Sequence, residues 1–120
     1  MAVHMKGLIV CVCQGTCPSF HKMNVFEVIN HFRRNKKVDF VVIHPQLCAT
    51  DGDNFWRALL SGNRDVERVI VAGCDPVMQR KMFGWVFREL GFDESKFRGV
   101  EIRNMSTEEA IKAIEDALST

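Results

Sequence analysis

The chain has 120 residues, of which 47% are hydrophobic and 26% are charged, and its formal net charge is +1. These values are typical of one globular domain and provide no overall attraction to nucleic acid or to a membrane surface. No apolar run approaches the ~20 residues of a membrane span and no signal peptide is visible, so we expect a cytoplasmic protein with neither a nucleic-acid nor a membrane partner.

The first part of the chain predicts a strand, a helix and a second strand. Residues 7–12 form a short apolar run typical of a strand, and turn residues around Gly15 follow it. Apolar residues recur at helical spacing over residues 24–32, and the basic segment 33–37 complements the dipole of a helix that ends there. Nucleic-acid binding by this basic segment is the alternative, but no aromatic platform accompanies it. Residues 38–43 predict the second strand.

The second part alternates in the same way. Residues 69–73 are a β-branched run that ends at a glycine, which is typical of a buried strand. Asp75 and Pro76 suit the cap and the first turn of a helix that we expect at about 76–90, with Gly91 as its stop signal. The other predicted elements are a loop at 47–51, a short helix at 54–60, a strand at 97–102 and a last helix opened by a capping box at 106–109.

The order of elements is therefore β-α-β-α-β-α-β-α. Alternating units of this kind form a parallel sheet with helices on both faces. We predict a single small doubly wound α/β domain over residues 6–120, with a four-stranded, mainly parallel sheet of the flavodoxin-like or Rossmann-like type. Residues 1–5 show no pattern, and we expect a disordered or vector-derived terminus there.

Five cysteines are many for a domain of this size. Their odd number, and the close spacing of Cys11 and Cys13, do not match the disulfide framework of a small secreted protein. The alternatives are metal or cluster ligation, thiol redox chemistry, or buried thiols that only pack as small hydrophobic residues.

The cysteines follow the ends of the predicted strands. Cys11 and Cys13 follow the first strand, while Cys17 lies in the loop after them. Cys48 follows the second strand and Cys74 follows the third. Because the carboxyl ends of parallel strands meet at one edge of a sheet, where open α/β sheets bind ligands, we expect the thiols to converge there.

Four converging thiols suit an iron–sulfur cluster, whose usual ligands are thiolates. A zinc site of four cysteines needs the same number of ligands, but such sites usually use two close pairs, and only Cys11 and Cys13 are such a pair. Thiol redox chemistry would use Cys11 or Cys13 as the attacking thiolate and Cys17 as the resolving thiol. A phosphate site lacks the usual glycine spacing and lysine, and a flavin would rest on fold analogy alone.

Two further residues are candidates for a role at this edge. His44 ends the second predicted strand; it either lowers the pKa of a thiol or ligates a metal, or it is a partly buried histidine bonded to the backbone. Trp85 lies off the apolar stripe of its predicted helix, and we expect it to be an exposed residue that docks a partner.

Three short segments also resemble a known family. Residues 10–13 (Val-Cys-Val-Cys), 47–48 (Leu-Cys) and 71–76 (Val-Ala-Gly-Cys-Asp-Pro) are similar to the cysteine elements of the amino-terminal domain in the flavin-binding subunit of heterodisulfide reductase. Residues 89–97 are similar to that domain and to the delta iron–sulfur subunit of methyl-viologen-reducing hydrogenase. The resemblance covers nearly the whole chain, roughly residues 6–118.

This resemblance implies an iron–sulfur domain that relays electrons to or from a partner subunit. The implied partner is an oxidoreductase of the heterodisulfide reductase, hydrogenase or flavoprotein type. A [4Fe–4S] cluster is the favoured cofactor and a [2Fe–2S] cluster is the alternative, with Cys17 as a substitute ligand. The ligands that the resemblance implies are Cys11, Cys13, Cys48 and Cys74.

The chain also departs from the family pattern. Gln14 stands where the family usually has a glycine, and Val77 and Gln79 stand where it has an arginine and a histidine. No flavin-binding half and no ferredoxin motif follows, so we expect a stand-alone electron-transfer module more than a self-contained enzyme. The alternatives are a thiol-based redox enzyme or sensor and a four-cysteine zinc-binding structural module.

Overall fold

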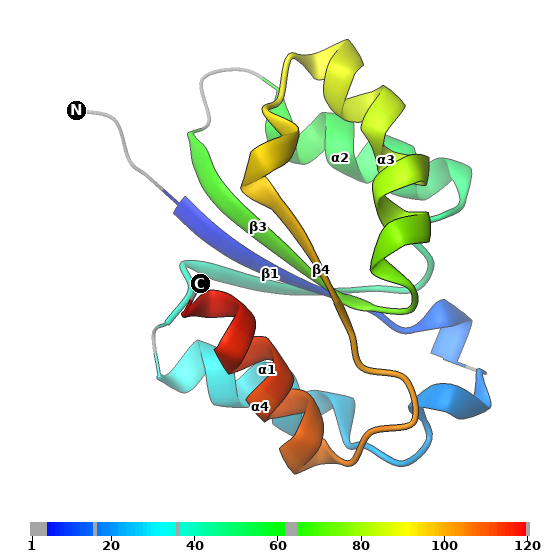
Figure 1. Cartoon of the computed structure of the whole chain (residues 1–120), viewed down its shortest axis with the longest axis vertical. Coiled ribbons are helices and arrows are strands. Elements are labelled where there is room, and N and C mark those ends of the chain that lie inside the picture. Colours follow the sequence, from blue (N-terminus) through cyan, green and yellow to red (C-terminus); the bar gives the residue numbers. More distant parts are fainter. Residues whose placement is uncertain (1–4, 16, 36, 62–64, 120) are drawn as a thin grey trace.

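The computed structural model of the chain describes residues 5–15, 17–35, 37–61 and 65–119. Within these residues, one sheet of four parallel strands lies between two layers of helices (Figure 1). The predicted doubly wound α/β domain is confirmed, and every strand pair is parallel. The strands lie in the order β2-β1-β3-β4 and are β1 (Met5–Cys11), β2 (Phe40–His44), β3 (Val66–Gly73) and β4 (Phe97–Glu101).

The helices cover the two faces of the sheet in pairs. α1 and α4 pack on one face, and α2 and α3 pack on the other (Figure 1). No helix in the described part of the chain combines the length and the apolar character needed to cross a bilayer. The helices are α1 (Val25–Arg34), α2 (Thr50–Leu60), α3 (Pro76–Leu90) and α4 (Thr107–Leu118), and the short 3₁₀ turns are η1 (Cys13–Gly15), η2 (Pro18–Phe20) and η3 (Glu94–Lys96).

Strand β1 is buried on both sides and divides its side chains between the two faces. Leu8 and Val10 belong to the hydrophobic cluster under α1 and α4, whereas Ile9 and Cys11 belong to the cluster under α2 and α3. This division follows from the strand itself, because successive side chains point to opposite faces of a sheet. The Cys11 side chain is therefore directed to the α2/α3 face.

Helix α3 begins and ends where the sequence predicts. The Asp75 carboxylate accepts a hydrogen bond of 2.9 Å from the Val77 N–H, and Pro76 occupies the first turn. Gly91 closes the helix with a φ of 68°, a left-handed conformation that glycine adopts without strain. The predicted capping box at the start of α4 is also present, since Ser106 and Glu109 each accept a hydrogen bond from the other's backbone N–H.

Helix α2 begins at Thr50, earlier than the predicted start at residue 54. Gly52 lies inside the first turn and is buried. A Cβ at this position would overlap the Leu47 carbonyl, so glycine lets the helix approach the preceding loop closely. The sequence predicts a disordered terminus at residues 1–5. Residues 1–4 lie outside the described part of the chain, and Met5 is ordered as the first residue of β1.

The strand order creates a switch point between β1 and β3. The chain leaves β1 toward β2 on one side and reaches β3 on the other side, so the connections after these two neighbours diverge. Val10 pairs with Ala72 in the register of the two strands, and both strands end within a few residues of that pair. In doubly wound sheets the crevice outside the carboxyl ends at such a point is the usual ligand site.

Candidate functional site

The structure brings the predicted cysteines to the carboxyl edge of the sheet. Cys11 is the last residue of β1, and Cys13 begins η1 just beyond it. Cys48 lies in the loop between β2 and α2, and Cys74 lies in the turn between β3 and α3. Cys11 and Cys13 each interact electrostatically with both Cys48 and Cys74, so the four thiols lie in the same region of the edge. We call this the thiol edge.

Cys11 is the buried member of the thiol edge. It packs in the α2/α3 cluster that also contains Leu47 and Trp56. The Leu47 N–H donates a hydrogen bond of 3.3 Å to the Cys11 Sγ. Burial raises the pKa of the Cys11 thiol, and the Leu47 N–H opposes that rise because it stabilises a negative sulfur. A bound cation at this sulfur would remove the cost of ionising it.

Cys13 and Cys17 lie on the opposite side of the edge from Cys11. Both pack against the hydrophobic cluster under α1 and α4, and both remain partly exposed. Burial raises the pKa of Cys13, and the charge of Cys17 raises it further. The pKa of Cys17 is lowered, chiefly by the Ser19 backbone N–H and hydroxyl and also by the neighbouring Cys13 thiol and Arg103. Cys17 is therefore the thiol with the greater tendency to ionise.

Cys48 is the exposed member of the thiol edge. The Gln46 side-chain amide donates a hydrogen bond of 3.3 Å to its Sγ. A cavity of about 200 Å³ opens beside it, between the start of α2 and the outer side of α3. The cavity is lined by Leu47, Cys48, Asp53, Met82, Phe83 and Trp85. The exposed sulfur thus adjoins an apolar surface.

His44 is buried and supports the loop that carries Cys48. Its Nδ1 accepts a hydrogen bond of 3.0 Å from the Gln46 backbone N–H, which leaves the proton of a neutral ring on Nε2. That Nε2 lies 3.5 Å from an Asp51 carboxylate oxygen, and the ring packs against Phe55. The sequence left open whether His44 acts on a thiol or metal or is bonded to the backbone. In the structure it is bonded to the backbone, at the Gln46 N–H.

Arg103 is a residue of this site that sequence reasoning missed. It follows β4 and forms an ion pair of 2.7 Å with Glu101. Its charge acts on both Cys17 and Cys74, so it is a cation beside the thiol edge. The same rule that placed the cysteines could have found it, because the residues after β4 also lie at the carboxyl edge.

Gln79 is a second missed residue, and it lies directly behind the thiol edge. Its side chain is 2% exposed and fills the space above two glycines of neighbouring strands. A Cβ at Gly73 would lie 3.1 Å from its Nε2 and 3.3 Å from the Cβ of Cys11, and a Cβ at Gly99 would lie 2.8 Å from its Oε1. The Oε1 atom has no hydrogen-bond partner among the described residues. A buried amide thus stands next to the Cys11 side chain.

The thiol edge has the residue types that ligate an iron–sulfur cluster or a zinc ion. All five cysteines are free thiols, and a backbone N–H and an arginine offset negative charge there. The sulfurs face two sides of the edge, however. No three Cys, His, Asp or Glu side chains within residues 5–15, 17–35, 37–61 and 65–119 are grouped closely enough to hold a metal ion. Side-chain rotation would have to bring the sulfurs together around a bound group.

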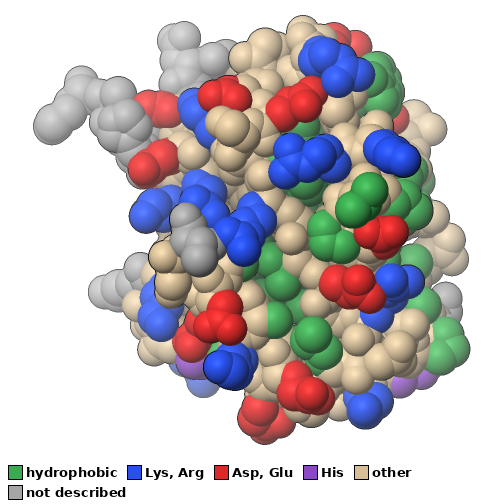
Figure 2. All heavy atoms as spheres, in the orientation of Figure 1, with side chains coloured by type: hydrophobic (Ala, Val, Ile, Leu, Met, Phe, Trp, Pro, Cys, Tyr) green, Lys and Arg blue, Asp and Glu red, His purple; other side chains and the backbone are tan. Residues whose placement is uncertain are grey.

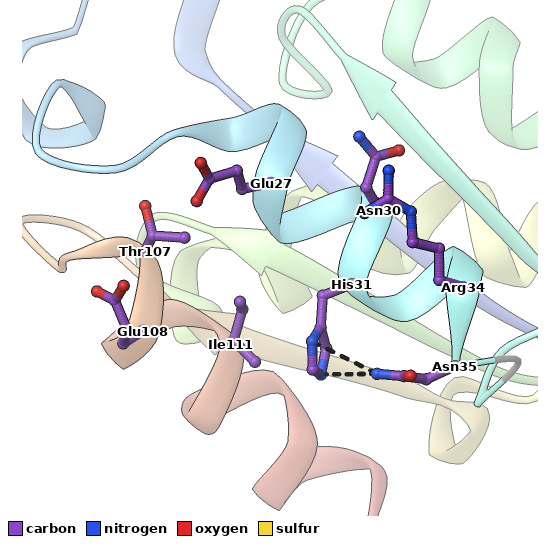
Figure 3. A pocket seen from close by; sticks show the side chains of 8 residues that line it. All are labelled: Glu27, Asn30, His31, Arg34, Asn35, Thr107, Glu108 and Ile111. Atoms are coloured by element: carbon purple, nitrogen blue, oxygen red, sulfur yellow. Dashed lines mark hydrogen bonds between the residues drawn. The ribbon is translucent and has the colours of Figure 1, made fainter.

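A separate groove of about 470 Å³ lies between α1 and α4 (Figure 3). The His31 Nε2 lies 2.6 Å from a Glu115 carboxylate oxygen, and the Asn35 amide lies 3.2 Å from the same ring nitrogen. The His31–Glu115 contact joins the two helices, and the Asn35 contact lies within the end of α1. None of the cysteines lines the groove, whose walls are Glu27, Asn30, His31, Arg34, Asn35, Thr107, Glu108 and Ile111.

The chain was compared with models of known protein families and with curated proteins. No family model matches it, and no curated protein matches it. The chemistry of the thiol edge is therefore the basis on which a function can be assigned.

Proposed function

We propose that the chain is an iron–sulfur electron-transfer module that resembles the amino-terminal domain in the flavin-binding subunit of heterodisulfide reductase. The observation that carries the proposal is the gathering of four cysteines around the carboxyl ends of β1 and β3, where a doubly wound sheet binds its ligand. The proposed ligands are Cys11, Cys13, Cys48 and Cys74. A [4Fe–4S] cluster is favoured because it takes four thiolates, and a [2Fe–2S] cluster is the alternative.

When bound, the cluster would supply one-electron redox chemistry. The residues of the chain would hold it and set its environment. The Leu47 N–H, which donates to the Cys11 Sγ at 3.3 Å, stabilises negative charge on that sulfur. Arg103 adds a positive charge near Cys74. The buried α2/α3 cluster keeps water from the Cys11 side of the site, so both charge and hydration are controlled by the protein.

The proposed partner is an oxidoreductase subunit of the heterodisulfide reductase, hydrogenase or flavoprotein type. Val77, Met78 and Trp85 are exposed on α3, which begins directly after Cys74. Figure 2 shows hydrophobic side chains gathered over the right-hand side of that view, where the strands have their carboxyl ends in Figure 1. Tryptophan and methionine are enriched in protein interfaces, and an apolar surface beside a redox centre suits a docking partner. We propose that the module works in the cytoplasm, where thiols stay reduced.

The test is to express the chain with iron and sulfide available and to purify it without oxygen. We expect a brown protein with broad visible absorbance and about four iron and four sulfide per chain for a [4Fe–4S] cluster. Cys48→Ser and Cys74→Ser should each lose most of the iron, whereas the matched variant Cys17→Ser should retain it. A colourless protein that never binds iron, or a Cys17→Ser variant that alone loses it, would contradict the proposal.

A thiol-based redox enzyme or sensor is the second candidate. The observation that favours it is that Cys13 and Cys17 pack against the same cluster and affect each other's pKa, with the pKa of Cys17 lowered. The sequence suggested a resolving role for Cys17, but on this geometry it is the better attacking thiol. Zinc is a third candidate, and metal analysis separates all three, because a zinc protein is colourless and a thiol enzyme needs no metal.

A further inference from the structure

Cys13 and Cys17 form a pair within the five cysteines. Cys13 has a φ of 52°, and the left-handed residues Gln14 (φ 66°) and Gly15 (φ 77°) follow it. The Gly15 N–H closes this turn with a hydrogen bond of 3.0 Å to the Val12 carbonyl. Cys17 lies four positions after Cys13, both pack against the cluster under α1 and α4, and each thiol affects the pKa of the other, which indicates that they are neighbours.

This pair is set apart from the other thiols by its packing. Cys13 and Cys17 both pack against the cluster under α1 and α4, whereas Cys11 is enclosed in the cluster under α2 and α3. Cys13 and Cys17 are partly exposed, and Cys11 is buried. Both members of the pair are therefore partly open to solvent, whereas Cys11 is enclosed.

We infer that Cys13 and Cys17 are a modification site at which a low-molecular-weight disulfide, of the glutathione disulfide class, oxidises the pair to an intramolecular disulfide. The turn at Gln14 and Gly15 supplies the short loop that such a bond closes. Arg103, whose charge acts on Cys17, would favour the approach of an anionic disulfide.

The reaction proceeds by thiol–disulfide exchange. The thiolate of one cysteine attacks a sulfur of the small disulfide, whose S–S bond breaks and releases one small thiolate. A mixed disulfide with the protein forms. The second cysteine gives its proton to water and attacks the protein sulfur of the mixed disulfide, which forms the Cys13–Cys17 bond and releases the second small thiolate. The protein loses two electrons and two protons, and the small disulfide gains them.

The consequence for the thiol edge rests on the proposed function. Cys13 is one of the proposed ligands, whereas Cys17 is outside the set, so oxidation of the pair would remove one ligand of four. A ligand lost in this way returns on reduction by a small dithiol, because the same exchange runs in reverse. Cys17 would thus compete reversibly with the cluster for the Cys13 sulfur.

The first experiment uses the full chain without iron. The protein is equilibrated with increasing ratios of glutathione disulfide to glutathione, then alkylated and digested with trypsin. Cys11, Cys13 and Cys17 fall on one tryptic peptide, residues 7–22, so fragmentation of that peptide must locate the bond. We expect a loss of two hydrogens, with Cys11 alkylated and Cys13 and Cys17 protected, before any other pair reacts. The matched control Cys74→Ser should behave in the same way, and Cys17→Ser should stop at a glutathione adduct.

A different result would overturn the inference. If Cys11 pairs first with any cysteine, or if Cys13 and Cys17 remain open to alkylation at every ratio, they are not the modification site.

A second experiment tests the coupling to the cluster in iron-loaded protein. The same oxidation should release most of the iron from the wild type and little from Cys17→Ser, and equal release from both would overturn the coupling. A chain that binds no iron at all would refute the proposed function instead, while the bond mapped in the first experiment would still stand.

Discussion

The two faces of the sheet bury the cysteines at its carboxyl edge to different extents. The α2/α3 face is aromatic, with Trp56, Phe83 and Phe87 in mutual ring contact at centroid distances of 5.1 to 6.2 Å, and it encloses Cys11. The α1/α4 face is largely aliphatic, and Cys13 and Cys17 lie at its rim. One edge therefore offers a sulfur that is held away from water and two that are open to reagents.

The pKa values of Cys11 and Cys17 are shifted in opposite directions. Burial raises the pKa of Cys11, so at neutral pH the free thiol stays protonated and unreactive until a cation binds. Ser19 lowers the pKa of Cys17, so that thiol ionises more readily. Burial also raises the pKa of Cys13, which packs on the same face as Cys17. The reactivity of each thiol at this edge therefore depends on its immediate surroundings as well as on the face where it packs.

The largest expected effect comes from opening the aromatic face. Trp56→Ala removes a fully buried ring and should lower the free energy of unfolding by about 3–5 kcal/mol, measured by urea denaturation. It should also speed alkylation of Cys11 in the folded protein. Ile114→Ala, in the core of the other face, should cost about 2–5 kcal/mol and leave the alkylation of Cys11 unchanged. Equal acceleration in both variants would erase the distinction between the faces.

A smaller loss of unfolding free energy should follow when α2 is pushed away from the loop at Leu47. Gly52→Ala places a Cβ against the Leu47 carbonyl, so the loop must shift and the hydrogen bond from the Leu47 N–H to Cys11 is strained. We expect a loss of about 1–3 kcal/mol in unfolding free energy. Gly84→Ala is the control, because its Cβ would meet only the flexible ends of long side chains such as Arg88, and alanine favours a helix by up to about 1 kcal/mol. A neutral Gly52→Ala would show that the close approach is not required.

The caps at the carboxyl edge should have effects of about 1 kcal/mol each. Asp75→Ala removes the acceptor of the Val77 N–H, and Ser106→Ala removes half of the capping box of α4. Asp75→Asn should retain most of the stability, since asparagine caps almost as well as aspartate. The stability of the three variants is measured by thermal unfolding. A full loss in Asp75→Asn would indicate that the charge of Asp75 matters more than its hydrogen bond.

The smallest effect concerns the reactivity of Cys17. Ser19→Ala removes the hydroxyl that helps to lower the pKa of Cys17, so the pKa should rise and less thiolate should be present at pH 7. We expect alkylation of Cys17 by iodoacetamide to slow several-fold at pH 7 and to match the wild type at alkaline pH, where both are ionised. Ser19→Thr should restore the rate. An unchanged pH profile would assign the lowered pKa to the backbone N–H alone.

Much of the fold could be predicted because its signals are local. The apolar runs predict the strands, and Asp75 and Gly91 delimit α3 through hydrogen bonds and backbone angles that involve only neighbouring residues. The start of α2 could not be predicted in the same way. Gly52 is a glycine because the Leu47 carbonyl approaches it in the folded chain, and a local pattern does not distinguish that requirement from a loop.

The candidate site could also be predicted only in part. Parallel strands predict that the cysteines share one edge, and their mutual electrostatic effects are consistent with that prediction. The face on which each sulfur packs could not be predicted, since it depends on the pleat of β1 at Cys11 and on the left-handed turn that begins at Cys13. Arg103 is remote from Cys17 in sequence, so only the rule that residues after β4 reach the same edge could have indicated it.

Gln79 and the two glycines that accommodate it behave as one unit. A methyl group at Gly73 or Gly99 would press on opposite ends of the same amide, which has no free space to retreat because it is buried. Natural relatives of this chain should therefore show covariation between positions 73 and 79, with alanine at 73 accompanied by a shorter side chain at 79, whereas a Cβ at 99 would also meet Pro76 at 2.7 Å and should stay rare. In a combinatorial library of codons 73 and 79, selection for folded protein should recover such paired changes and deplete alanine at 73 alone.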